Sequence, residues 1–186
     1  MFLSYLEKIK FVEVIRDFSD EKARNAIFPV HRILLYLIIG LMLGCGRIFH
    51  FRKLQHDALL LRFLGGRLPH HSLLYKELAH LGRSCPQLPM ELRKLSSEVV
   101  RPCLPDKQIL DLDSSVETVY AEQAGAAKGV NSHKPERHSY HPLLAFEGQT
   151  HLNLNARLRP GNTHSMTDAV DFLRQTFDLL GKPHLF

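Results

Sequence analysis

The sequence lacks paired cysteines. Its three cysteines, Cys45, Cys85 and Cys103, are odd in number, and no two of them have Cys-x-x-Cys spacing. Small secreted proteins depend on several disulfides, and zinc ribbons depend on closely spaced cysteine pairs. The sequence therefore favours neither kind of scaffold, and a reduced, cytoplasmic compartment fits it best.

Long hydrophobic runs are also missing. The longest run, residues 33–46, is shorter than the roughly 18 to 20 residues that span a bilayer. The first ten residues mix apolar and charged positions and lack the small-residue cleavage site of a signal peptide. We therefore expect no membrane association, and we expect the run to form a buried helix in which Gly40 and Gly44 allow close packing.

Several motifs with known chemistry are absent as well. There is no P-loop, Rossmann glycine fingerprint, nucleophile elbow or kinase signature. Of the twelve histidines, His133, His138 and His141 lie near one another, but no cysteines accompany them and no zinc-like spacing occurs. The sequence does not favour a zinc site, and it indicates that these histidines face solvent or DNA.

Positive charge is concentrated in the first part of the chain. Residues 1–107 hold 17 Lys and Arg against 10 Asp and Glu, whereas residues 108–186 hold 7 against 9. A basic segment favours a polyanionic partner such as DNA. An ordinary solvated basic surface explains the same count, so charge alone leaves both interpretations open.

The first part of the chain is expected to be helical. Apolar residues recur at three- and four-residue spacing in the first and last of three segments, the middle segment is apolar nearly all round, and Gly65-Gly66 ends the last one. The expected helices are residues 2–15, residues 33–43 and residues 49–64. Ser19-Asp20 is a plausible helix start, and Pro29 marks a break.

A second short unit follows the glycine pair. Residues 68–78 resemble a turn that enters a helix, with Ser72 as the cap. A helix, a glycine turn and a second helix are typical of a helix-turn-helix that binds DNA, although a plain helical hairpin gives the same pattern. The residues expected to face DNA are His70, His71, Tyr75 and Lys76.

The pattern then changes from helical to alternating. Residues 84–105 contain four prolines around a short helix at 91–100, and we interpret them as a connector. Three strands are expected after it, at residues 108–113, 140–146 and 151–158. In the third strand, the residues expected to share one buried face are Leu152, Leu154, Ala156 and Leu158.

A final helix is expected to begin near Ser165, with Asp168 completing a capping pattern, and to end at Gly181. Its expected buried stripe is Met166, Ala169, Val170, Leu173, Phe177 and Leu180. The predicted fold class is α+β, with a helical, basic domain at residues 1–105 and a sheet-containing domain at residues 106–186.

Two aspartates are the strongest candidates for chemistry. Asp111 and Asp113 alternate within the first expected strand, so they point to the same face. Two such carboxylates at the end of an apolar strand suit a hard cation such as Mg²⁺, which prefers carboxylate oxygens. Simple exposure at the strand end is the alternative.

Five cations flank the strands and are candidates for contacts with DNA phosphates. They are Lys128, Lys134, Arg137, Arg157 and Arg159. Arg and Lys bind phosphates without reading base sequence. Arg157 and Arg159 alternate with the apolar positions of the third strand, so both are expected on the face opposite the apolar stripe.

Several segments together resemble the IS1380-type transposases of the IS4-like DDE group. The resemblance is strong over residues 109–180 and looser over the helical part, at 29–32, around Asp57 and at 68–78. The segments that carry it are Leu110-Asp-Leu-Asp-Ser-Ser-Val-Glu-Thr-Val-Tyr120, Glu122 to Gly129, Lys134-Pro135, Ser139 to Phe146, and Leu158-Arg-Pro-Gly-Asn-Thr-His164.

The resemblance implies an RNase H-like catalytic domain whose first three strands are antiparallel and precede a helix. It implies three acids, two Asp and one Glu, that hold two Mg²⁺ or Mn²⁺ ions for cleavage and joining of DNA. Asp113 matches the first acid best, and Asp111 is the second choice. The helical part would bind the terminal inverted repeats of an insertion sequence.

The resemblance also implies that the second and third acids follow the last expected helix. We therefore expect an incomplete and inactive chain, truncated before these acids and completed only if a second chain supplies them. The alternative is a non-catalytic DNA-binding fragment, with a possible homodimer, that represses intact transposase copies. An inert remnant with an open sheet edge is the third interpretation.

Overall fold

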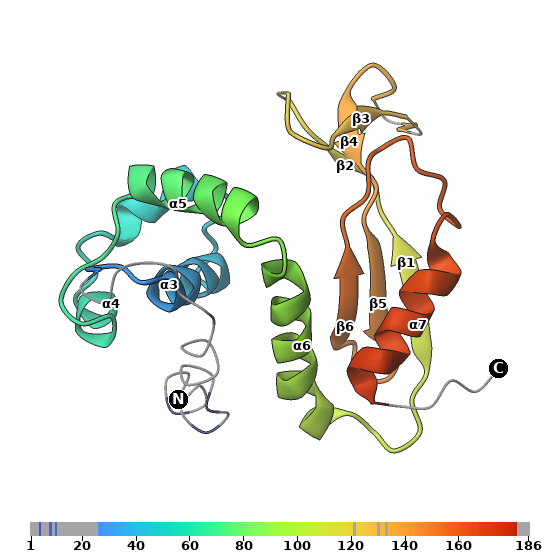
Figure 1. The fold of residues 1–186 in the computed structure, drawn as a ribbon, viewed down its shortest axis with the longest axis horizontal. Coiled ribbons are helices and arrows are strands. Elements are labelled where there is room, and N and C mark those ends of the chain that lie inside the picture. The colour runs from blue at the N-terminus through green and yellow to red at the C-terminus, as the bar shows by residue number, and fades with distance from the viewer. Residues whose placement is uncertain are drawn as a thin grey trace. The chain divides into compact units, whose positions relative to one another are not determined.

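The fold is mixed, with helices and two small antiparallel three-stranded sheets (Figure 1). The computed structural model describes residues 26–120, 122–129, 131–132 and 134–181, together with Ser4, Lys8 and Lys10. Most of the helix expected at residues 2–15, and the start at Ser19-Asp20, lie outside the described residues. The chain divides into two compact units, residues 1–91 and 92–186.

Helix α3 (Val30–Met42) forms the centre of the first unit. It begins directly after Pro29, whose fixed φ and missing N–H suit a helix start. The helix is apolar nearly all round, and most of its side chains are buried, as expected for a central helix. The expectation of a buried helix in the longest apolar run is confirmed. None of the described helices is long and apolar enough to cross a membrane.

A glycine lets an aromatic ring pack against this helix. A Cβ added at Gly40 would lie 2.1 Å from the Phe51 ring, so only glycine leaves room for that ring. Tyr36 meets the same ring edge-on, with centroids 5.1 Å apart, and donates a hydrogen bond to the Phe51 carbonyl. The packing role expected of Gly40 is confirmed. It is wrong for Gly44, which follows the helix and would meet nothing within 4 Å.

The single helix expected at residues 49–64 is wrong, because the chain forms two short helices there. These are the 3-10 helix η1 (Ile48–Leu54) and α4 (Ala58–Phe63). Asp57 causes the break, since its side chain accepts a hydrogen bond from the Leu60 N–H and starts a new helix. Gly65-Gly66 ends α4 with φ of +77° and +85°, as expected.

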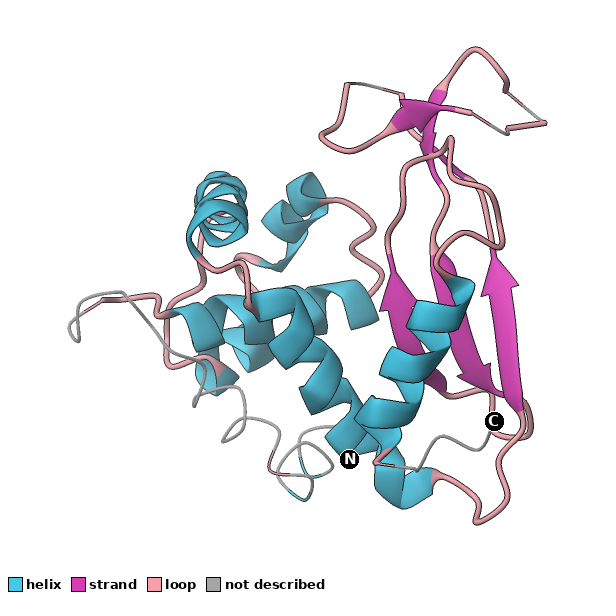
Figure 2. Ribbon diagram, turned by 45° about the vertical axis from the view of Figure 1, so that its right-hand side comes forward, coloured by secondary structure: helices cyan, strands magenta, loops and turns pink. Residues whose placement is uncertain are grey.

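Helix α5 (His71–Ser84) follows and packs against η1. Its N-cap is His70 rather than the expected Ser72, because the His70 ring accepts the hydrogen bond from the Ser72 N–H. Leu74 and Leu81 are its buried side chains. Figure 2 shows that the described part of the first unit is built from helices.

The second unit holds the main sheet. The helix expected at residues 91–100 begins earlier, as α6 (Leu88–Val100), and η2 (Arg101–Cys103) follows it. The main sheet has the order β1-β5-β6, with every pair antiparallel. Its strands are β1 (Leu110–Ser114), β5 (Leu143–Glu147) and β6 (Asn153–Arg157). The three expected strands are confirmed, and β1 lies at an edge.

Helix α7 (Ala169–Leu180) covers one face of this sheet (Figure 1). Phe172 and Leu180 pack there against Leu143, Ala145 and Leu154. The helix begins later than expected, and Asp168 precedes it with a left-handed φ of 59° and no capping hydrogen bond.

The predicted buried stripe of α7 is confirmed at Ala169 and Leu180, and Leu173 and Phe177 are half-buried, but the prediction is wrong at its other two positions. Met166 and Val170 are exposed, and Phe172, Thr176 and Leu179 are buried instead. The predicted stripe of β6 is confirmed at Leu154, which is buried, and wrong at Ala156 and Leu158, which are exposed. A register shift in the pairing between β5 and β6 breaks the simple alternation.

A second sheet forms from residues that lie mostly between the first two expected strands. Its order is β2-β4-β3, with β2 (Glu117–Thr118), β4 (His138–Tyr140) and β3 (Ala127–Lys128). The register that pairs Leu110 with Glu147 in the main sheet is unchanged where Glu117 pairs with Tyr140. Residues 110–118 and 139–147 therefore form one two-stranded ribbon that runs through both sheets.

A buried carboxylate anchors the base of this ribbon. Glu147 is fully buried and accepts hydrogen bonds from the backbone N–H groups of Ile109, Gln149 and Thr150 and from the Thr150 hydroxyl. Burial acts to raise the pKa of Glu147, but these donors together outweigh it and lower the pKa. The carboxylate thus joins the start of β1 to the turn between β5 and β6.

Replacing Gly40 by Ala should destabilise the chain, because the new methyl group overlaps the Phe51 ring. We expect the free energy of unfolding in urea to fall by about 1 to 3 kcal/mol. Gly82→Ala is the matched control: Gly82 is exposed in α5 with nothing within 4 Å of an added Cβ. That variant should gain about 0.5 to 1 kcal/mol. Equal stability of Gly40→Ala and the wild type would contradict this packing.

Glu147 should make stability depend on pH. Its folded-state pKa is lowered, so its contribution is complete above the unfolded-state pKa of about 4.3 and is lost as pH falls through the folded pKa. We expect Glu147→Gln to melt at a lower temperature than the wild type at pH 7 and the difference to shrink toward pH 3. Glu136→Gln, at an exposed position, should match the wild type. A pH-independent difference would contradict the role of the carboxylate.

Candidate functional site

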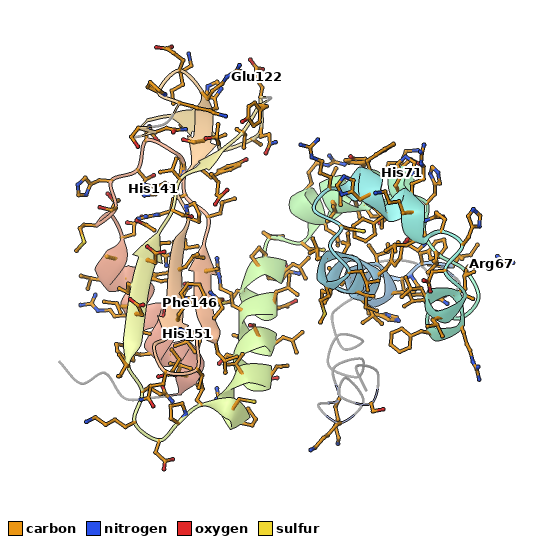
Figure 3. The ribbon with its side chains drawn as sticks, turned by 180° about the vertical axis from the view of Figure 1, so that it is seen from behind. Arg67, His71, Glu122, His141, Phe146 and His151 are labelled. Carbon is orange, nitrogen blue, oxygen red and sulfur yellow. The ribbon has the colours of Figure 1, made fainter. Side chains whose placement is uncertain are left out.

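Asp111 and Asp113 lie on the exposed face of the main sheet. Burial alternates along β1, with Leu110 and Leu112 half-buried toward α7 and both aspartates exposed. The register pairs Asp111 with Phe146, so that side chain lies on the same face. Figure 3 views the molecule from behind and labels Phe146. The two carboxylates thus share one face, on the side of the sheet away from α7.

Asp113 sits at the carboxyl end of β1, where the ribbon leaves the main sheet. One of its oxygens accepts a hydrogen bond from the Ser114 N–H at 2.8 Å, which fixes the side chain beside the strand end. No strand among the described residues pairs with the outer edge of β1. Both the exposed face and the outer edge of this strand are therefore open in the described structure.

Donor groups for a cation are few around these aspartates. Within the described ranges, no group of three or more His, Cys, Asp or Glu side chains is arranged to hold a metal ion. His141 is buried, and its Nδ1 lies 2.6 Å from the Thr163 carbonyl oxygen, so that ring joins the ribbon to the loop after β6. His133 lies outside the described residues.

Three of the predicted phosphate contacts gather at the far end of the ribbon. Lys128 lies in β3, with its Nζ 4.0 Å from Glu136. Lys134 and Arg137 both flank the ring of Tyr120, with Nζ 4.8 Å and Cζ 5.8 Å from the ring centroid. The hydrogen bond and charge of Lys134 lower the pKa of the Tyr120 hydroxyl.

The other two predicted contacts are placed differently. Arg157 pairs with Asp171 at 2.9 Å on the α7 side of the sheet. Arg159 is only 3% exposed, so its expected position on the surface is wrong. Its guanidinium donates instead to the carbonyls of His141, His164, Ser165 and Thr167. Arg159 therefore holds the loop after β6, and it does not present its charge to a ligand.

Sequence reasoning missed Tyr120. The ring is 67% exposed, and its two cations come from positions 14 and 17 residues later in the chain. Spacing along the sequence gives no sign of this arrangement, because it arises only when the chain folds back and pairs β2 with β4.

In the first unit, the surface of η1 and α5 gathers cations, histidines and aromatic rings. Arg52 lies over the Phe49 ring at 4.8 Å, and His71 meets that ring edge-on at 5.5 Å. The His70 and His71 rings are 4.1 Å apart. Burial, and then the charges of His70 and Arg52, lower the pKa of His71. Figure 3 labels His71 in this unit.

The predicted contacts on α5 lie on this surface. Tyr75 is 53% exposed, and Lys76 is exposed beside it. Residues 26–91 contain eight Lys and Arg against three Asp and Glu. We call the surface made by Phe49, Arg52, His70, His71, Tyr75 and Lys76 the η1–α5 surface. Its mixture of cations and exposed rings is typical of nucleic-acid interfaces.

Comparison with known proteins identifies the family of this chain. The model of one protein family, transposase DDE domain group 1, matches residues 4–182. No curated protein and no solved structure matches the chain. Because the family model spans nearly all of the sequence, including β1 with its two aspartates, the chain belongs to the transposase DDE domain group 1 family.

Proposed function

We propose that this protein is a transposase of the IS1380 type, which acts in the cytoplasm on the ends of a bacterial insertion sequence by metal-dependent DNA cleavage and strand transfer. The observation that carries the proposal is the placement of Asp111 and Asp113 on the exposed face of β1, in a chain of the DDE family. Three antiparallel strands followed by a helix are also the order in which an RNase H-like domain begins.

Asp113 is the proposed first catalytic acid. It lies at the end of β1, where the strand meets solvent, and the Ser114 N–H orients one of its oxygens. Asp111 lies deeper along the strand, opposite Phe146. A strand end is the better place for a group that must reach DNA, and Asp111 remains the second choice.

The donor chemistry at this site fits a Mg²⁺ or Mn²⁺ ion. Two exposed carboxylates on one face match the preference of hard cations for oxygen ligands, and Mg²⁺ is often held by one or two carboxylates with waters and substrate phosphates. Such an ion, when bound, activates a water or a 3′-hydroxyl and stabilises charge at the DNA phosphodiester. Asp113 would contribute to holding it, and Asp111 would add negative charge on the same face.

We further propose that residues 1–186 alone bind DNA without cutting it. Asp111 and Asp113 are the only carboxylates that the described strands place on the exposed face of the main sheet. Glu147 is buried under backbone donors, and Glu117 lies on the ribbon beyond β1. Cutting would then require further acids, from a segment after α7 or from a complementing chain.

The η1–α5 surface is the proposed contact with the terminal inverted repeats. It combines Arg52, Lys76 and two histidines with exposed rings on a strongly basic unit. Phosphate contacts supply most of the affinity of such surfaces and make it depend on salt. If the η1–α5 surface is the only functional part of the protein, the protein is a DNA-binding fragment, as a monomer or homodimer, that represses intact copies of the transposase. The family match favours the catalytic interpretation.

One experiment tests binding and cutting together. A labelled inverted-repeat duplex is incubated with the protein and Mg²⁺ or Mn²⁺ over a range of salt concentrations. We expect binding that weakens steeply with salt and no strand cleavage. Lys76→Ala should weaken binding and reduce the salt slope by about one. Lys94→Ala, which removes the same charge from an exposed position of α6, should leave both the affinity and the salt slope unchanged.

Absence of binding at low salt would refute the proposed DNA interface. Cleavage by these 186 residues that disappears in Asp113→Ala would refute the proposal that they cannot cut, while supporting the role of Asp113.

A further inference from the structure

We propose that Tyr120, with Lys134 and Arg137, forms a stacking site for an unpaired base of DNA. We call these three residues the ribbon tip. The inference rests on the proposed function, because it takes DNA to be the ligand of the second unit. It adds a site for single-stranded DNA, distinct from the duplex contact on the η1–α5 surface.

The ribbon connects the tip directly to the candidate catalytic strand. The pairing register is the same on both sides of its interruption at residues 115–116. Tyr120 follows Asp113 by seven residues, and because even a fully extended chain spans only about 24 Å over that length, the two residues lie no farther apart than this. The tip therefore lies within reach of a DNA strand whose phosphate is held near Asp113.

Close backbone packing fixes the base of the tip. A Cβ at Gly129 would lie 2.2 Å from the Gly161 carbonyl oxygen, and a Cβ at Gly161 would lie 2.1 Å from the Ser139 hydroxyl. The loop held by Arg159 thus packs against β3 and β4 without space for side chains. Tyr140, which bridges to Pro160, also donates a hydrogen bond to the Ala124 carbonyl. Val119, which precedes Tyr120, donates its N–H to the His138 carbonyl of β4, so the backbone that carries the ring is attached to this packed support.

The ring itself is presented to solvent. Tyr120 is among the most exposed large side chains of the described residues, at 67%. Lys134 contacts both the hydroxyl and the ring, and Arg137 lies near the ring face. No described carboxylate forms an ion pair with either cation. The tip therefore presents one aromatic surface and two cations to a ligand.

These features fit a single strand better than a duplex. Sites for single-stranded nucleic acid combine cations that follow the phosphates with aromatic rings on which bases stack. The bases of a duplex are already stacked on one another, so a ring reaches a base face only where the base is unpaired. A duplex would use the two cations but would leave the exposed Tyr120 ring without a role.

The test compares two probes with the full chain. One is a 12-nucleotide single strand with 2-aminopurine at its centre, and the other is the same strand in a blunt duplex. We expect the single strand to bind with quenching of the 2-aminopurine fluorescence, as stacking requires. Tyr120→Ala should weaken single-strand binding roughly 5- to 100-fold and remove the quenching, with duplex affinity unchanged within about twofold.

Two further variants separate stacking from other roles. Tyr120→Phe keeps the ring and loses only the hydroxyl, so it should retain quenching and most of the affinity. Tyr75→Ala, on the η1–α5 surface, should weaken duplex binding and leave the quenching intact.

The proposal is overturned if the wild type binds no single strand, if Tyr120→Ala matches the wild type, or if that variant loses duplex and single-strand affinity equally. Failure of the proposed function would give a different result. The wild type would not bind the inverted-repeat duplex, or Lys76→Ala would bind it as well as the wild type does.

Discussion

The second unit depends on one antiparallel register that runs from Leu110 against Glu147 to Thr118 against Ser139. A slip of one residue in this register would turn Asp111 and Asp113 toward α7 and Leu112 toward solvent. Glu147 fixes the register at one end by binding the Ile109 N–H and the turn after β5. The same pairing carries the chain beyond the main sheet and brings Lys134 and Arg137 to Tyr120.

The two units supply different parts of the proposed activity. The first is held by Phe51 against the bare backbone of Gly40, and it presents a basic surface with exposed rings on η1 and α5. That surface suits a duplex, whose phosphates lie along both strands. The second unit presents two carboxylates on an open sheet face and an exposed aromatic ring with two cations beside it. In the proposed reaction that arrangement suits the reacting strand, because the carboxylates would hold a metal ion at its phosphate and the ring would stack on an unpaired base.

The sequence predicted the strands, the central helix and the shared face of Asp111 and Asp113, because alternation and apolar runs reflect local geometry. It failed where a tertiary contact decides the outcome. Alternation along the strand predicted an exposed Arg159, but its guanidinium is buried and donates to four backbone carbonyls. The apolar periodicity predicted one helix at residues 49–64, but the N-cap at Asp57 starts a new helix there. The Tyr120 site exists only because the chain folds back and brings Lys134 beside the ring. The roles of the predicted site residues in DNA and metal binding remain predictions.

The proposed first metal-binding acid on β1 is tested most directly by Mn²⁺ titration of the full chain, followed by NMR. Paramagnetic broadening should appear first at the amides of residues 111–114 and of Leu144, which pairs with Asp113. Asp113→Asn should abolish this broadening, and Glu136→Gln, at an exposed carboxylate, should preserve it. Broadening spread evenly over exposed carboxylates, or unchanged in Asp113→Asn, would show that β1 does not carry this metal-binding acid.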